Sequence, residues 1–255
     1  MVKDLFPLSI KSFAFVLFLF FSMFAHADEK PVIALVIDDI CGDAGERSEA
    51  SLALRHDINL TYSVLSNGSK DCLDSLKNID WEGSDKMLHM PMEPLGDANP
   101  GDGAIMMGDK RASVISKLSN TYKNIPDAIG VNNHMGSAVT AHEQTMKVII
   151  PWITRKKMLF LDSATSQTHS CGFVPYETLC LRNDIFLDHV QTKAEVTKAL
   201  NRAVAIAKRE GRPIIAIAHP HPETTQALKE IIALDTVEFI SISSYQRLLN
   251  SEQSD

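Results

Sequence analysis

The residues of this chain that could do chemistry stand where apolar segments end. Residues 32–37 are aliphatic throughout, which is typical of a strand buried on both faces, and they lead directly into Asp38 and Asp39. Two adjacent carboxylates repel each other unless a cation or a shared proton relieves the repulsion. The pair therefore indicates either a metal or acid–base site, or an acidic turn that caps the following helix.

Other imidazoles and carboxylates occupy equivalent places along the chain. Strands alternate with helices, which favours parallel β-structure with right-handed crossovers. The carboxyl ends of parallel strands share one rim, so residues far apart in sequence can meet there. Three histidines with carboxylates on one rim favour a metal and acid–base site. The residues at or just past these strand ends, besides the acidic pair, are His89, His134, Asp162, Asp188 and His219.

Short apolar strands and amphipathic helices must position these side chains. Pro91 and Pro94 are expected to end the third strand, and residues 97–108 read as an exposed loop over the site. Thr140 and Glu143 form a capping-box pattern, and a kink or break is expected at Pro151. The expected strands are residues 32–39, 58–65, 86–89, 128–131, 158–161, 184–189 and 213–218, with a short one near 237–242.

The first 27 residues resemble an export signal. They hold two lysines, an apolar run over residues 13–24 and the small residues Ala25 and Ala27, so we expect cleavage after Ala27. An uncleaved anchor is the alternative, although the apolar run is shorter than the ~20 residues that span a bilayer. Residues 28–255 then form a single exported domain, expected in the periplasm with no stable membrane span. The net charge of −7 disfavours binding to nucleic acid.

Four cysteines in an exported chain permit disulfides. Three pairings are possible, and we favour Cys171 with Cys180, which closes a short loop, leaving Cys41 with Cys72. Free thiols are the alternative. Zinc ligation by cysteine is less favoured because the sequence has no Cys-x-x-Cys pair.

Six segments of the chain match the motifs of a known family, in that family's order and across nearly the whole mature chain. They are residues 37–39, 89–94, 130–137, 160–163, 182–188 and 218–222. In these segments the chain resembles the divergent polysaccharide deacetylase family, relatives of the NodB-type carbohydrate esterases. The resemblance implies a distorted seven-stranded (β/α) barrel of α/β class with a divalent metal at the strand ends, acting on an acetylated glycan.

The resemblance also implies site roles. In the wider deacetylase group the first carboxylate of the acidic pair is the general base, and the second binds metal with two histidines spaced as H-x-x-x-H. By this resemblance Asp38 is the base and Asp39 is the metal ligand. Four positions after His89, however, stands Glu93. Either His134 supplies the missing ligand or Glu93 replaces it with oxygen. We prefer Asp39, His89 and His134, and zinc as the metal, because a mixed nitrogen and oxygen site with an open position suits zinc.

The resulting hypothesis is metal-dependent hydrolysis of an N-acetyl or O-acetyl group on an envelope polysaccharide. Asp38 acts as base, His219 protonates the leaving group, and Asp162 is the candidate that orients His219. Three further residues are proposed to support a ligand or to line the rim, and they are Glu93, Asn133 and Asp188. The alternative for them is a solvated loop or a strand-end turn.

A non-catalytic protein is the rival hypothesis. It would keep a glycan or metal pocket and serve envelope assembly without turnover. The missing spaced histidine favours it, as does the replacement of the usual arginine-containing substrate motif by residues 132–134. The sequence does not identify the glycan, the acetyl linkage, the oligomeric state or any protein partner.

Overall fold

The computed structural model describes residues 30–42, 45–81, 83–168, 170–173 and 178–252. Contacts divide the chain into residues 1–30 and residues 31–255, and every described helix and strand belongs to the second unit. The expected export signal, residues 1–27, lies outside the described residues. None of the described helices combines the length and the apolar character that crossing a bilayer requires.

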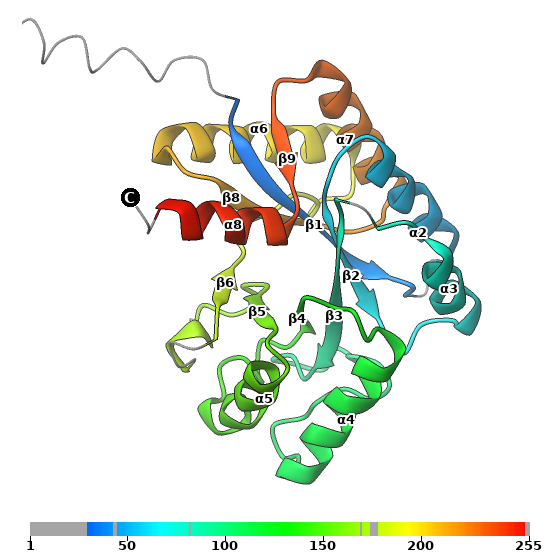
Figure 1. Ribbon diagram of the computed structural model, residues 1–255, viewed down its shortest axis with the longest axis vertical. Coiled ribbons are helices and arrows are strands. Elements are labelled where there is room, and N and C mark those ends of the chain that lie inside the picture. The colour runs from blue at the N-terminus through cyan, green and yellow to red at the C-terminus, as the bar shows by residue number, and fades with distance from the viewer. Residues whose placement is uncertain (1–29, 43–44, 82, 169, 174–177, 253–255) are drawn as a thin grey trace, which may run out of the picture. The chain divides into compact units, whose positions relative to one another are not determined.

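The described part of the chain is built around a parallel sheet of nine strands (Figure 1). Its order is β6-β5-β4-β3-β2-β1-β8-β7, and β9 pairs with the beginning of β1. The strands are β1 Val32–Ile40, β2 Thr61–Leu65, β3 Asp85–Met92, β4 Gly130–Met135, β5 Leu159–Asp162, β6 Cys180–Arg182, β7 Ile185–Phe186, β8 Ile214–Ala218 and β9 Glu238–Ile240.

Helices α2 to α7 connect the strands and pack against one face of the sheet, whereas α8 packs against the other face through Ile242 and Tyr245. The longest is α6. Its N-cap is Thr192, whose hydroxyl accepts from the Glu195 N–H, and its C-cap is Gly211, in the left-handed conformation that glycine favours. The helices are α2 Gly45–Leu52, α3 Lys70–Ser75, α4 Arg111–Asn124, α5 Glu143–Arg155, α6 Lys193–Glu210, α7 Pro222–Leu234 and α8 Ile242–Glu252.

Alternation along the strands separates the core into two clusters. In β1, Ile33, Leu35 and Ile37 belong to the larger cluster beneath helices α2 to α7. Ala34 and Val36 belong to the smaller cluster, on the other face of the sheet. Successive strand residues point to opposite faces, so Asp38 continues the second series. We call this second face the inner face.

The fold prediction of a distorted α/β barrel is confirmed, with differences in the strands. The expected strand over residues 184–189 is reduced to β7, and a further short strand, β6, begins at Cys180, where the expected cysteine loop ends. Backbone hydrogen bonds explain why the strand is divided. The Asn183 N–H donates to the Asp162 carbonyl, whereas the Asp184 N–H donates to the Ile215 carbonyl. The chain thus leaves β5 and joins β8 between adjacent residues, which places β6 and β7 at opposite ends of the sheet order.

Two local predictions were wrong, and a third was wrong in part. Strand β3 continues through Pro91, because β2 pairs with β3 only as far as His89 and Pro91 therefore needs no N–H on that side. Helix α5 continues through Pro151, so the break that was one of the two expectations at this residue does not occur. The expected capping box is absent, since the Thr140 hydroxyl donates to the Gly136 carbonyl and His142 is the N-cap of α5.

The preferred cysteine pairing is confirmed. The two disulfides join Cys41 to Cys72 and Cys171 to Cys180. The first fastens the end of β1 to α3, and the second closes the short loop before β6. None of the described cysteines is free.

Candidate metal centre and acid–base site

The end of β1 brings both adjacent carboxylates into one site. The register between β1 and β2 shifts between Ile37 and Ile40. Within that irregular stretch Asp39 has a φ of 58°, the left-handed region that side-chain-bearing residues rarely adopt. This bulge lets Asp39 reach the same site as Asp38, which a regular strand would forbid.

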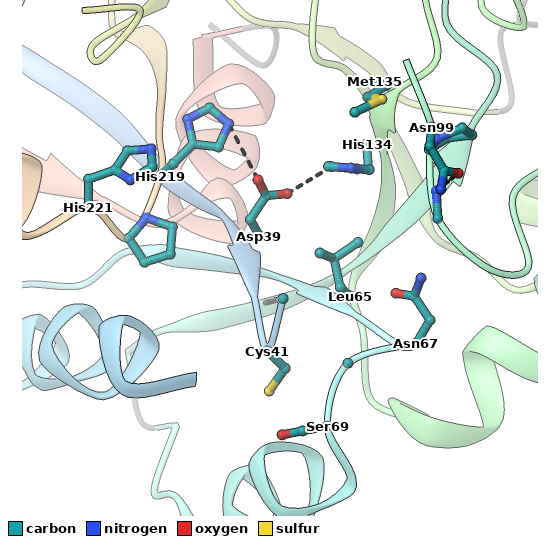
Figure 2. A pocket seen from close by; sticks show the side chains of 15 residues that line it. Asp39, Cys41, Leu65, Asn67, Ser69, Asn99, His134, Met135, His219 and His221 are labelled. Atoms are coloured by element: carbon teal, nitrogen blue, oxygen red, sulfur yellow. Dashed lines mark hydrogen bonds and ion pairs between the residues drawn. The ribbon is translucent and has the colours of Figure 1, made fainter. Parts of the chain in front are cut away.

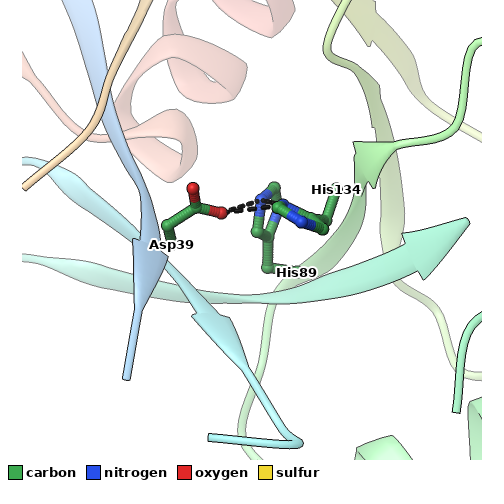
Figure 3. A group of neighbouring side chains, drawn as sticks. All are labelled: Asp39, His89 and His134. Atoms are coloured by element: carbon green, nitrogen blue, oxygen red, sulfur yellow. Dashed lines mark hydrogen bonds and ion pairs between the residues drawn. The ribbon is translucent and has the colours of Figure 1, made fainter. Parts of the chain in front are cut away.

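Three ligand atoms meet in a small triangle beside the bulge (Figure 3). Asp39 Oδ1 lies 2.9 Å from His89 Nε2 and 2.8 Å from His134 Nδ1. The two histidine nitrogens lie 3.2 Å apart. The predicted metal ligands Asp39, His89 and His134 are therefore brought together by the ends of β1, β3 and β4.

The triangle passes a test of fit to a metal. Asp39 Oδ1 is buried and has no hydrogen-bond partner, which is costly for a carboxylate oxygen. Separations of about 3 Å between ligand atoms suit one ion with ligand bonds of about 2 Å, the length found for zinc with nitrogen and oxygen. One carboxylate and two imidazoles also form a common donor set for zinc.

The two carboxylates differ in their ionisation. Burial alone would raise the pKa of Asp39, but contact with the rings of His134 and His89 holds that pKa well below its usual range. The nearby His89 and His219 would lower the pKa of Asp38, but burial outweighs them and raises that pKa above its ordinary value. Asp38 is only 2% exposed, and its Oδ2 lies 3.8 Å from His89 Nε2.

His219 and His134 lie on opposite sides of the Asp39 carboxylate (Figure 2). Its Nε2 lies 4.0 Å from Asp39 Oδ2. Its Nδ1 lies 2.9 Å from Asp188 Oδ1, and its backbone N–H donates to Asp188 Oδ2 over 2.6 Å. Although burial opposes the charged ring, hydrogen bonding to Asp188 raises the pKa of His219 to about 9. The protonated ring therefore faces Asp39 with Nε2.

The orienting role predicted for Asp162 is wrong, and Asp188 holds His219 instead. Asp162 accepts from the Arg182 guanidinium and from Ser170 Oγ. It lies at the end of β5, whereas Asp188 follows β7, the neighbour of β8. The strand order, which spacing in the sequence does not reveal, decides which carboxylate reaches His219.

Two supporting predictions were also wrong. Glu93 Oε2 accepts from the Met107 N–H over 2.7 Å, so it fastens the loop over residues 97–108 instead of a ligand histidine. Asn133 lies on the face opposite the site, where its Oδ1 accepts from the Ser163 N–H and its Nδ2 donates to the Met135 carbonyl. It braces the end of β4 and does not line the rim.

Asp188, His219 and His221 form a second group with atoms close enough to hold an ion. Both carboxylate oxygens of Asp188 are already engaged, since Oδ2 also accepts from Thr224 Oγ1 over 3.0 Å. His221 is the residue before helix α7, and Pro222 lies in the first turn of that helix. This group therefore fits the positioning of His219 better than a second ion.

Asn132 is a site residue that sequence reasoning missed. This side chain is fully buried and bonds to Asp38 Oδ1 over 2.8 Å and to His89 Nδ1 over 2.9 Å. His89 and Asn132 are register partners in β3 and β4, which explains their contact on the inner face. Alternation along β4 distinguishes Asn132 from Asn133, but the expected strand ended at residue 131, just before the pair, whereas β4 continues to Met135.

A cavity of about 610 Å³ opens over the site (Figure 2). Asp39, His134 and His219 line it, whereas Asp38 does not. The loop over residues 97–108 contributes to its wall, as the sequence suggested. The other residues lining this cavity are Cys41, Gly42, Leu65, Asn67, Gly68, Ser69, Asn99, Pro100, Gly101, Met135, Pro220 and His221.

Comparison with known proteins bears on this site. The model of the divergent polysaccharide deacetylase family matches residues 35–249. An uncharacterized protein of Haemophilus influenzae is 33% identical over 224 residues, which cover 87% of this chain and 77% of that protein.

Solved structures share the fold. The uncharacterized protein ATU2773 from Agrobacterium tumefaciens matches with a TM-score of 0.73 at 22% identity, over 86% of this chain and 90% of that one. A family 4 acetyl xylan esterase from Clostridium thermocellum, in complex with a cobalt ion, matches with a TM-score of 0.52 at 11% identity, over 85% and 91%.

Proposed function

The chain belongs to the divergent polysaccharide deacetylase family, and on that basis we propose that it is a metal-dependent hydrolase of acetylated envelope polysaccharide. The reaction is hydrolysis of an N-acetyl or O-acetyl group on a glycan. The observation that carries the proposal is the triangle of Asp39, His89 and His134, with a buried carboxylate oxygen that lacks a hydrogen-bond partner.

The triangle would hold the metal, and the donor set favours zinc. When bound, a divalent ion polarises an acetyl carbonyl and lowers the pKa of water to about 7. Asp39 contributes the charge that attracts the ion, since contact with both rings keeps it ionised. The two rings are held on neighbouring strands, so the chain presents these ligands in one arrangement.

Asp38 is the proposed base. It would take a proton from the attacking water, and its raised pKa suits a base working near neutral pH. The amide of Asn132 fixes its Oδ1, which leaves Oδ2 directed toward His89 Nε2. The proton thus has a defined acceptor atom.

His219 is the proposed acid. As the acetyl carbon releases the sugar amine or alkoxide, His219 Nε2 would give its proton to that leaving atom. Asp188 holds the ring through Nδ1 and stabilises its charged form. His219 and His134 both line the cavity, so an acetyl group entering it lies between the acid and the triangle.

Acetate release tests the proposal. The mature chain with one equivalent of zinc should release acetate from acetylated chito-oligosaccharides or acetylated xylan. Asp38→Asn and His219→Gln should each reduce that rate by about 100-fold or more. Glu93→Gln is the matched control, because this carboxylate fastens a loop and should leave the rate within about twofold. If the loaded protein releases no acetate from either class of glycan, catalysis is refuted.

Binding without turnover is the second candidate. The observation that favours it is the burial of Asp38, which is 2% exposed and does not line the cavity. A chain of this kind would bind zinc and an acetylated glycan, and Asp38→Asn would leave glycan affinity unchanged. Calorimetric titration with the same glycans, together with the acetate assay, separates the two candidates.

We further propose that the chain is exported, with residues 1–27 as a cleaved signal and residues 28–255 as the periplasmic domain. The two disulfides support an oxidising compartment. Mass spectrometry of the protein recovered from the periplasm should show Asp28 as the first residue, and a mature chain that retains Met1 would refute cleavage.

A further inference from the structure

A buried amide joins the proposed base to a proposed metal ligand. Asn132 is fully buried on the inner face of β4. Its Nδ2 donates to Asp38 Oδ1 over 2.8 Å and approaches Ser163 Oγ at 3.4 Å. Its Oδ1 accepts from Ser63 Oγ and lies 2.9 Å from His89 Nδ1. Both donors and both acceptor positions of this amide are therefore used.

The carboxylate of Asp38 fixes which end of the amide faces which neighbour. A carboxylate only accepts, so the NH₂ end of Asn132 must face it. Flipping the amide would place its oxygen against the carboxylate and leave Ser63 without its acceptor. In a fully buried site that loss has no compensation from water.

The orientation of the amide determines the tautomer of His89. The oxygen of Asn132 faces Nδ1 of the ring, and an amide oxygen only accepts, so Nδ1 must carry a proton. In the neutral ring the lone pair then lies on Nε2. That atom lies 2.9 Å from Asp39 Oδ1 and 3.2 Å from His134 Nδ1, within the triangle of ligand atoms.

We propose that Asn132 is a positioning residue that fixes the Nδ1–H tautomer of His89 and the orientation of Asp38 at once. It acts through its two neighbours and does not touch the cavity. The inference deepens the proposed function, and rests on it only for the identity of the bound metal. An amide suits this place because it is at once a donor and an acceptor, which neither a carboxylate nor an ammonium group is.

The neighbouring Asn133 provides a matched control. It has the same side chain, is 1% exposed and also makes hydrogen bonds through both ends of its amide. Those bonds brace the end of β4 on the opposite face and contact neither Asp38 nor His89. Asn133→Ala should therefore destabilise the protein without changing the tautomer or the affinity for zinc.

The experiment measures the zinc dissociation constant by competition with a chelator and the His89 tautomer from two-bond ¹H–¹⁵N spectra. Wild type should show Nδ1–H. Asn132→Ala and Asn132→Asp should weaken zinc binding by about 10- to 100-fold, the usual loss when a partner of a ligand histidine is removed. Asn132→Asp keeps an acceptor for His89, so it should retain the tautomer better than Asn132→Ala while repelling Asp38.

Several results would overturn the inference. The first is an Nε2–H tautomer of His89 in the wild-type protein, which needs no variant. The second is a zinc affinity within twofold of wild type in both Asn132 variants. An equal loss in Asn133→Ala would show a general structural effect. If wild type binds no zinc, the proposed function fails, and the tautomer of zinc-free wild type, read where the ring is neutral, still decides the role of Asn132.

Discussion

Removal of the disulfide between Cys41 and Cys72 should affect the candidate site as well as stability. Cys41 comes two residues after Asp39, and both have left-handed φ values, 66° and 58°. Cys41 is fully buried, and the Gly42 N–H donates back to the Asp39 carbonyl over 3.1 Å. The disulfide therefore ties an unfavourable backbone turn to helix α3, and that turn directs Asp39 toward the histidines.

Chain entropy gives the expected cost for each disulfide. The sequence separations are 31 residues for Cys41–Cys72 and 9 residues for Cys171–Cys180. Loop closure then predicts a loss of about 3.7 kcal/mol in the free energy of unfolding for the first and about 2.6 kcal/mol for the second. Both double-alanine variants should unfold at lower urea concentration, with the first the less stable by about 1 kcal/mol.

Zinc affinity separates the two variants more sharply. Without the Cys41–Cys72 bond, the end of β1 can relax to ordinary φ values, which are favoured by about 1–3 kcal/mol for each residue. The fraction of molecules with Asp39 in place falls accordingly, so zinc binding should weaken by about tenfold. The Cys171–Cys180 variant should bind zinc within about twofold of wild type, because that bond lies beside β6. Equal zinc affinity in both variants would refute this reasoning.

Three further perturbations have defined outcomes. His219 has a raised pKa of about 9, so its pair with Asp188 stabilises the fold fully below pH 6.5 and progressively less as the pH rises through 9. In zinc-free protein Asp188→Asn should therefore cost about 2 kcal/mol at pH 6 and much less at pH 10, measured by urea unfolding; an equal cost at both values contradicts the pairing. Glu93→Gln should leave zinc affinity within about twofold of wild type, measured by calorimetry. A tenfold loss would show that Glu93 supports a metal-binding histidine after all. Gly68→Ala places a Cβ 1.8 Å from a backbone carbonyl oxygen and should cost about 2–3 kcal/mol in urea unfolding, whereas Gly108→Ala, with nothing within 4 Å, should be nearly neutral.

The fold could be predicted because its signals are local. Apolar strand segments alternate with amphipathic helices, and parallel strands must then share a rim. The triangle of Asp39, His89 and His134 followed from that argument and the family resemblance. The bulge that turns Asp39 inward did not follow, because a left-handed aspartate leaves no mark in the sequence.

The partners of the site residues depend on strand order and register. Asp162 and Asp188 both lie at or just past the ends of predicted strands, but only β7 adjoins β8, the strand that leads into His219. Asn132 and Asn133 are adjacent, and the register of β3 with β4 decides which of them meets His89. Neither relation is encoded in local spacing, so those side chains were misassigned or missed.

Anomalous diffraction at the zinc edge tests the central claim most directly. Crystals of the mature protein grown with equimolar zinc should show one zinc ion per chain in contact with Asp39 Oδ1, His89 Nε2 and His134 Nδ1. Zinc bound only at Asp188, His219 and His221, or no anomalous peak at the rim, would contradict the account.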